Sequence, residues 1–258
     1  MSIPTYGQGL THPRHLAFEP STGCLFVAED STKEVWCFSR HQGQPYQRIA
    51  CGLANPIGVA FGKAGDLLVT DCADGVVLQI VDGEARPVIC GLKNPHGVAV
   101  DADGHVIVAD TGNEVVKVFD CDNDYALKHE FQVGFRPVDV ALQSSGRLVV
   151  VSYSGELVVF DPETGERLYH HDAKYATSVG LAVDADDRIY VTQHNHQRLV
   201  VFDPELNLLG PVDGLPPLTM AWGLKAVGGG NRVVLYVAEQ GRVSAFPIEF
   251  RPCLKKDE

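Results

Sequence analysis

Two histidines and one aspartate stand where their side chains could perform acid–base or metal chemistry. His15 and Asp139 each lie two residues after a proline that opens a short apolar segment, and His96 lies one residue after such a proline. A histidine pair near a carboxylate can bind a metal ion or serve as general acid and base. Whether the three groups meet depends on the elements that carry them.

These apolar segments belong to a repeat of about 41 residues. The stretch NPHGVAVDADGHVIVADTGNEVVKVFD, residues 94–120, returns with changes along the chain. A sixth, degenerate copy follows, in which Gly223 corresponds to Gly180. Self-similarity at a period of about 40 residues fixes the architecture of a chain. The first segment of the other five copies contains an alanine at the same place: Ala17, Ala60, Ala99, Ala141 and Ala182.

Each copy predicts a small antiparallel sheet. Short apolar runs such as GVAV, HVIVAD and VVKVF have the length of strands, and DADG, KAGD and QSSG between them suit tight turns. One such sheet cannot bury its faces, so the sheets stack radially. We therefore expect an all-β fold, a six-bladed β-propeller of four-stranded antiparallel blades, in one domain over residues 1–258.

The two ends of the chain are predicted to close the ring. The sixth copy ends near Phe250 without a fourth strand, while TYGQGL at residues 5–10 occupies the place of a fourth strand before the first copy. We expect residues 2–8 to supply the outer strand of the last blade, because closure removes unpaired sheet edges. Loops after the second strands are expected to reach the face on which the first strands begin, with Asp71 and Asp110 capping their own turns.

Composition narrows the partners and the compartment. The formal net charge is −12, from 21 basic and 33 acidic residues, which weighs against nucleic acid as a partner. Seven cysteines show no CxxC spacing, the N-terminus lacks the features of a signal peptide, and no apolar run approaches the length of a membrane span. We expect a cytoplasmic monomer that binds neither a membrane nor a cofactor.

Residues 94–120 resemble the NHL repeat, with its Pro-Gly-Val-Ala-Val-Asp opening, its strand ending in Ala-Asp and its Thr-Gly-Asn turn. The resemblance implies a six-bladed propeller with the first strand of each blade along the central channel, and no single function. The similar peptidylglycine amidating lyases hold zinc with histidines in Pro-His-Gly-Leu openings, which residues 95–98 match once. The corresponding positions elsewhere are Arg14, Ile57, Val138, Val179 and Trp222.

That single histidine does not predict a metal site, because catalytic zinc normally takes three protein ligands. Lactonase and strictosidine synthase-like propellers are implied to use acidic and Asn ligands or a Glu at the channel, and the sequence shows no convincing motif for them. The polar residues at the predicted channel mouth have a plain alternative, which is that they line a water-filled channel.

The sequence therefore favours a binding or scaffold propeller that recognises a protein or peptide on the channel-mouth face, and leans away from an enzyme. The alternative is a metal-dependent lyase or hydrolase at the central channel, centred on His15, His96 and Asp139 with His194 as a further ligand. A third reading is single-stranded RNA binding. The predicted ligand-binding residues are Arg14, His15, His96, Asp139, Tyr153, His194 and Trp222.

Overall fold

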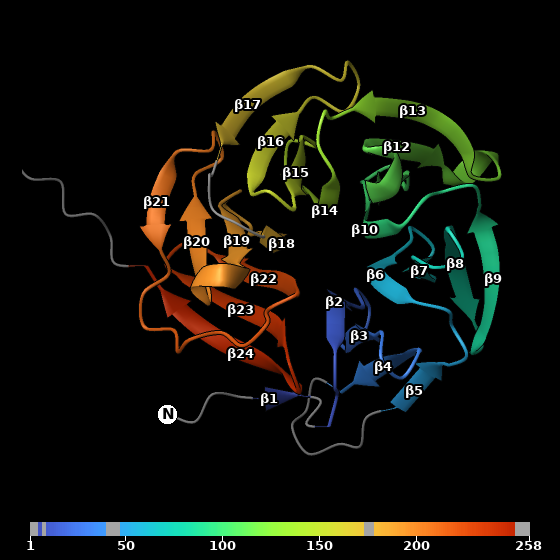
Figure 1. Ribbon diagram of the computed structural model, residues 1–258, viewed down its shortest axis with the longest axis horizontal. Coiled ribbons are helices and arrows are strands. Elements are labelled where there is room, and N and C mark those ends of the chain that lie inside the picture. Colours follow the sequence, from blue (N-terminus) through green and yellow to red (C-terminus); the bar gives the residue numbers. More distant parts are fainter. Residues whose placement is uncertain (1–4, 7–8, 40–46, 173–177, 251–258) are drawn as a thin grey trace, which may run out of the picture.

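The computed structural model describes residues 5–6, 9–39, 47–172 and 178–250, and these form a ring of six four-stranded antiparallel sheets (Figure 1). This confirms the predicted all-β six-bladed propeller. Each of the first five blades runs outward in chain order, so that its first strand lies nearest the ring centre (Figure 1).

The strands of these five blades are as follows. The first blade contains β2 (Pro13–Phe18), β3 (Leu25–Glu29), β4 (Glu34–Phe38) and β5 (Gln47–Ala50); the second contains β6 (Pro56–Phe61), β7 (Leu67–Asp71), β8 (Val76–Val81) and β9 (Glu84–Ile89); the third contains β10 (Pro95–Val100), β11 (Val106–Asp110), β12 (Val115–Asp120) and β13 (Ala126–Gln132); the fourth contains β14 (Pro137–Leu142), β15 (Leu148–Ser152), β16 (Glu156–Phe160) and β17 (Arg167–Asp172); the fifth contains β18 (Ser178–Val183), β19 (Ile189–Gln193), β20 (Arg198–Phe202) and β21 (Leu208–Pro211). Three single-turn helices lie between strands of the third and fifth blades: η1 (Thr111–Asn113), η2 (Cys121–Asn123) and η3 (His194–His196).

The sixth blade joins the two ends of the chain. It contains β22 (Gly223–Gly229), β23 (Arg232–Glu239) and β24 (Arg242–Glu249), and its outer strand is β1 (Thr5–Tyr6). Thr5 pairs with Ser244 and Tyr6 with Val243, and β1 lies beside β24 in Figure 1. The predicted closure is confirmed for Thr5 and Tyr6; the remaining residues of the predicted strand, 2–4 and 7–8, lie outside the described part.

The core lies between neighbouring blades rather than in the ring centre. The second strands of the first five blades are buried along their whole length, because neighbouring blades cover both of their faces. Between the third and fourth blades, Ile107 and Val116 pack with Phe131, Val140 and Val150. This explains why the second strands are continuous runs of apolar residues and not alternating ones.

Buried carboxylates at the ends of second strands attach each blade to the segment that enters it. Asp71 accepts hydrogen bonds from the amides of Ala54 (2.7 Å) and Asn55 (2.8 Å), and Asp110 accepts one from the amide of Lys93 (2.7 Å). Asp71 also accepts a longer bond, 3.4 Å, from the amide of Asp74 in its own turn. The expected turn caps are thus secondary to bonds with the incoming segment.

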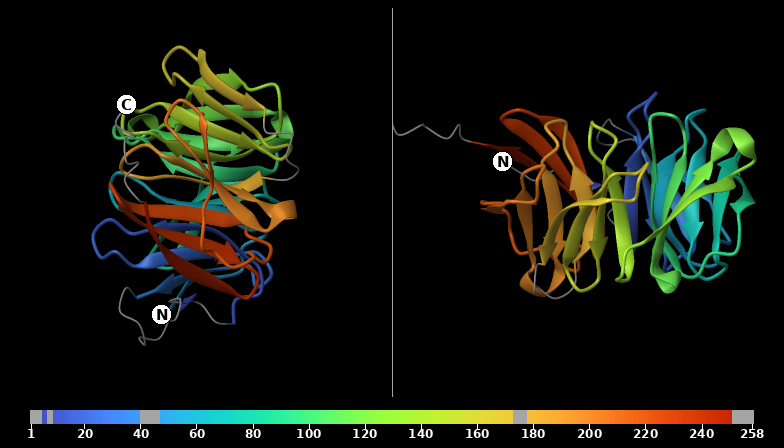
Figure 2. Two further views of the ribbon diagram at one scale, coloured as in Figure 1. Left: turned by 90° about the vertical axis from the view of Figure 1, so that its left-hand side faces the viewer. Right: turned by 90° about the horizontal axis from the view of Figure 1, so that it is seen from above.

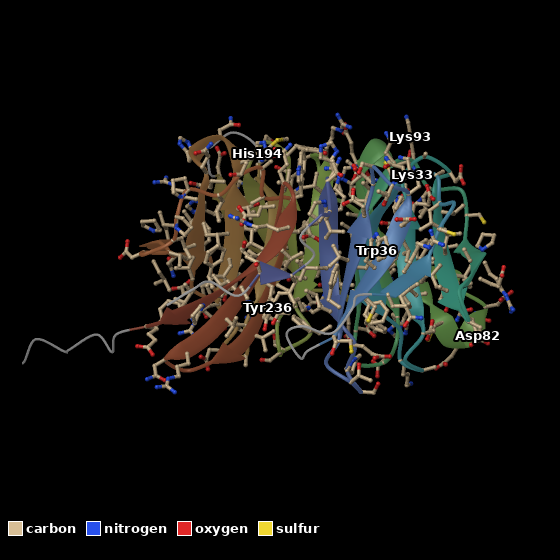
Figure 3. All side chains as sticks on the ribbon, turned by 90° about the horizontal axis from the view of Figure 1, so that it is seen from below. Lys33, Trp36, Asp82, Lys93, His194 and Tyr236 are labelled. Atoms are coloured by element: carbon tan, nitrogen blue, oxygen red, sulfur yellow. The ribbon has the colours of Figure 1, made fainter. Side chains whose placement is uncertain are left out.

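The blades form a ring with two faces, seen from the side in Figure 2. Lys33, Lys93 and His194 lie on one face and Asp82 on the other (Figure 3). The first face, called the mouth face below, is where the first strands begin, since Pro13 pairs with Glu29 and Pro95 with Asp110 at the ends of second strands. Among the described residues, no helix has the length and apolarity needed to cross a membrane.

Candidate functional site

The six first strands, β2, β6, β10, β14, β18 and β22, enclose a central cavity of about 290 Å³. At the position equivalent to His15 of the first blade, the fourth blade carries Asp139 and the other four blades carry glycine. The glycines allow neighbouring strands to approach closely. A Cβ on Gly223 would lie 2.2 Å from the carbonyl oxygen of Arg14. Only His15 and Asp139 therefore place side chains in this level of the channel.

His15 and Asp139 meet across the channel. The first blade neighbours the second and sixth blades, so the fourth blade lies opposite to it in the ring (Figure 1). Nevertheless, Nδ1 of His15 lies 3.4 Å from Oδ1 of Asp139, and the side chains are only 12% and 8% exposed. The carboxylate of Asp139 is fixed by hydrogen bonds from the amides of Val140 (2.9 Å) and Leu181 (3.0 Å).

Burial shifts both groups toward their uncharged forms. It raises the pKa of Asp139 to about 7, against the two amide bonds and the charge of Lys225, which lower it. Burial also lowers the pKa of His15 to about 4, and the charge of Arg14 adds to this effect. Near neutral pH, Asp139 can therefore lose or gain a proton beside an uncharged imidazole, which is the pattern of acid–base groups at functional sites.

Lys225 is a third polar side chain in the cavity, which the sequence analysis missed. It stands two residues after Gly223, at the position where the other five blades carry the repeated alanine. Lys225 is exposed to solvent, yet the protein around it displaces part of its hydration and so lowers its pKa, while the charge of Asp139 raises it. The signal was present in the repeat, since aligning Gly223 with Gly180 places Lys225 opposite Ala182.

Above the His15–Asp139 pair, one cluster of side chains joins the first, fifth and sixth blades. Nε of Arg14 donates a hydrogen bond to Asp30 (2.5 Å), and the guanidinium lies 4.1 Å from the centre of the Trp222 ring. The ring of His194, in η3, lies 5.2 Å from Trp222. Nδ1 of His194 is buried and has no hydrogen-bond partner among the described residues.

A second cluster joins the third and fourth blades. The rings of His96 and Tyr153 make an edge contact at 5.8 Å, and the guanidinium of Arg136 lies 5.9 Å from the Tyr153 ring. Burial lowers the pKa of His96 to about 3, with the charges of His15, Arg14 and Arg136 adding to it. His96 is therefore an uncharged imidazole at neutral pH.

The two clusters nearly close the channel at the mouth face. Side chains from all six blades leave a space of only about 10 Å³ there, lined by Arg14, His15, Ile57, His96, Val138, Tyr153, Val179 and Trp222. Of the seven residues predicted from the sequence, the structure places five around this space, Asp139 directly beneath it against His15, and His194 beside Trp222. All seven thus lie together at one end of the channel.

The mouth does not present three converging metal ligands. Among the described residues, three possible ligand atoms of His, Cys, Asp or Glu come within 4.8 Å of one another only at Asp101, Asp103 and His105. These residues follow β10, at the opposite end of that strand from His96. Because catalytic zinc normally takes three protein ligands, His15, His96 and Asp139 in this arrangement do not form a zinc centre.

Comparison with known proteins gives one family match and many structural likenesses. Residues 92–119, within the third blade, match the NHL repeat. No curated protein matches the sequence. A gluconolactonase from Xanthomonas campestris superposes with a TM-score of 0.78 at 16% identity, over 94% of this chain and 88% of the enzyme.

Two further structures show the range of proteins that share the ring. Virginiamycin B lyase from Staphylococcus aureus superposes with a TM-score of 0.66 at 14% identity, over 97% of this chain and 89% of the lyase. A chain of a nidogen–laminin complex gives a TM-score of 0.69 at 17% identity, over 78% of this chain and 80% of that one. At these identities the likeness establishes the fold.

The enzymes among these similar structures correct one prediction. The sequence favoured a propeller that binds a protein or peptide, whereas gluconolactonase and virginiamycin B lyase are a hydrolase and a lyase built on the same ring. Both are enzymes of the class that the sequence analysis left as its alternative, so the comparison favours that alternative over the protein-binding prediction. The NHL match in the third blade and the six four-stranded blades together confirm the resemblance found in the sequence: this chain is a six-bladed β-propeller that contains an NHL repeat at residues 92–119.

Proposed function

We propose that the chain is a hydrolase or lyase that uses His15 and Asp139 as acid and base in the central channel. The observation that carries this proposal is the contact of 3.4 Å between two buried titratable side chains that come from opposite blades. A propeller does not need this contact for packing, since four of its six blades have glycine at the same level. Function in a repeat scaffold lies where the copies differ.

Asp139 has a proton affinity suited to acid–base catalysis near neutral pH. With a pKa raised to about 7, Asp139 is present in both protonation states near neutral pH, and His15 is an uncharged imidazole that can accept a proton. Since the groups are in contact, they titrate as a unit. In this proposal one of them removes a proton from water or from substrate carbon, and the other gives a proton to the leaving oxygen.

The substrate that fits this proposal best is a lactone, the compound class in the name of the gluconolactonase that shares the fold. The cavity of about 290 Å³ beneath the pair is near the lower end of the volumes of small-molecule sites. It suits a compact ring and excludes a polymer. His15 and Asp139 line the cavity at the end nearest the mouth. They would therefore contact a lactone held in the cavity.

Turnover of a lactone panel, including glucono-δ-lactone, tests the proposal. We expect ring opening by the unaltered protein and a loss of about 100-fold or more in kcat/KM for Asp139→Asn and for His15→Asn. His170→Asn and Asp172→Asn, on the exposed outer strand β17, are matched controls that should keep full activity. Activity that survives both channel substitutions would disprove the assignment, and inhibition by a chelator would show that a metal ion takes part.

A further inference from the structure

Lys225 occupies a position that the ring does not need a lysine to fill. The corresponding residues of the other five blades are alanines, and each of them lines the same cavity: Ala17, Ala60, Ala99, Ala141 and Ala182. Five blades therefore pack correctly with a methyl group here. The long cationic side chain in the sixth blade adds a charge to the channel and no packing that the fold requires.

The charge of Lys225 lacks a partner. Within the described part of the chain, Lys225 forms no ion pair, whereas Arg14 and Lys117 bind carboxylates. The other titratable side chains that line the cavity are His15 and Asp139, and burial favours the uncharged form of each. The ammonium group of Lys225 faces the cavity with no ion pair and only a partly ionised carboxylate near it, and a bound anion would supply the missing counter-charge.

The backbone around Lys225 also suits an anion. In each blade the first strand is the inner edge of its sheet, so alternate backbone groups of six strands face the channel without a strand partner. Such N–H groups can donate hydrogen bonds to a carboxylate, and C=O groups can accept them from hydroxyl groups. The cavity volume of about 290 Å³ limits the ligand to a small molecule.

We propose that the central channel is a binding site for small hydroxycarboxylates, whose carboxylate pairs with Nζ of Lys225. The assignment of the ligand rests on the proposed function. When water opens a lactone, the bond between the carbonyl carbon and the ring oxygen breaks, the carbon takes the hydroxyl of water, and the ring oxygen takes its proton. The acid then releases a proton, and the product is a hydroxycarboxylate held beside the acid–base pair.

Binding is measured directly, without turnover, by calorimetry with D-gluconate and with sorbitol, its uncharged counterpart of the same chain length. We expect gluconate to bind, sorbitol not to bind, and Lys225→Ala to weaken gluconate binding by at least about tenfold. Lys225→Ala restores the alanine of the other blades and should fold, which its melting temperature verifies. Lys93→Ala, on the mouth face, is the matched control and should bind like the unaltered protein.

Equal gluconate affinity in Lys225→Ala, or no binding of gluconate at millimolar concentration, would overturn the proposal. If inorganic phosphate bound as tightly as gluconate, the channel would be a general anion site and the proposed carboxylate site would be wrong. The two proposals fail separately. Gluconate binding that depends on Lys225 without any lactone turnover would refute only the enzyme, whereas turnover that depends on Asp139 without gluconate binding would refute only the carboxylate site.

Discussion

Gly97 and Asp139 approach so closely that no side chain fits between them: a Cβ on Gly97 would lie 2.5 Å from Oδ1 of Asp139 and 2.7 Å from its Cα. The third blade thus sets the position of the carboxylate that the fourth blade contributes. Because the Cα is part of the backbone, Asp139 cannot yield by a simple change of rotamer. Any residue larger than glycine at position 97 must displace β14 itself.

We therefore expect Gly97→Ala to displace Asp139 and to destabilise the ring. Overpacking of a tight contact costs about 1–3 kcal/mol, or a fall in melting temperature of about 3–10 °C for a protein of this size. Lactone turnover should fall by more than the loss of folded protein can account for. Gly180→Ala is the matched control, since its Cβ would meet its nearest neighbours at 3.2 Å, and it should be tolerated better. Equal effects of the two substitutions would contradict the positioning role of Gly97.

Asp139→Asn should stabilise the protein at pH 7.5 and lose this advantage toward pH 4. The pKa of Asp139 is raised from 3.8 to about 7, so the unfolded state ionises first as the pH rises, and the penalty of the buried carboxylate grows between these two values. Below pH 4 both states are protonated and the penalty vanishes. The expected difference at pH 7.5 is on the order of 4 kcal/mol. Urea denaturation of both proteins across this pH range measures it, and a constant difference would refute the raised pKa.

Asp71→Ala should weaken the connection between the first and second blades. The carboxylate of Asp71 is fully buried and binds the amides of Ala54 and Asn55, which would lose their acceptor. A buried donor without a partner costs about 1–3 kcal/mol. Hydrogen exchange should show faster exchange at both amides. Asp74→Ala, on an exposed residue of the same turn, should change the two amides little; unchanged protection in Asp71→Ala would contradict the bridging role.

Removal of residues 1–8 should lower the melting temperature markedly, because β24 would lose the strand on its outer side and keep only β23 as a partner. Thr5 and Tyr6 supply that pairing, and the Tyr6 ring lies 6.0 Å from Tyr236. Thr5→Pro offers a milder test, since proline removes a backbone donor while the rest of the chain stays intact. We expect an intermediate melting temperature for it. A deletion variant as stable as the full chain would show that the sixth blade does not depend on its outer strand.

The sequence predicted the ring and the mouth because both follow from the repeat. Strand-length apolar runs and turn residues recur, so the position of each opening proline predicts which side chains reach the mouth. The sequence grouped His15 with His96 and Asp139, but the direct contact of His15 with Asp139 could not be predicted, because it depends on the diameter of the closed ring and on the four glycines that let neighbouring strands approach closely. Lys225 was missed since the sixth copy departs most from the repeat.

The function was predicted wrongly for a related reason. The sequence offered His15, His96 and Asp139, from three blades, only as a possible metal-dependent site, whereas the candidate site joins His15 and Asp139 with Lys225 of the sixth blade. No local spacing encodes such a site. The expectations of a monomer without a nucleic-acid partner remain predictions.

The pairing of β1 with β24 also governs the order in which the molecule folds. A strand near the start of the chain has to wait for one of the last strands to be made before it acquires a partner. Contacts between residues so far apart in sequence form slowly, because the entropy of closing a long loop is lost before the contact contributes. The ring is thus completed late during synthesis. Until then the surfaces with which the first and sixth blades face each other stay uncovered, and exposed apolar surface of this kind promotes aggregation.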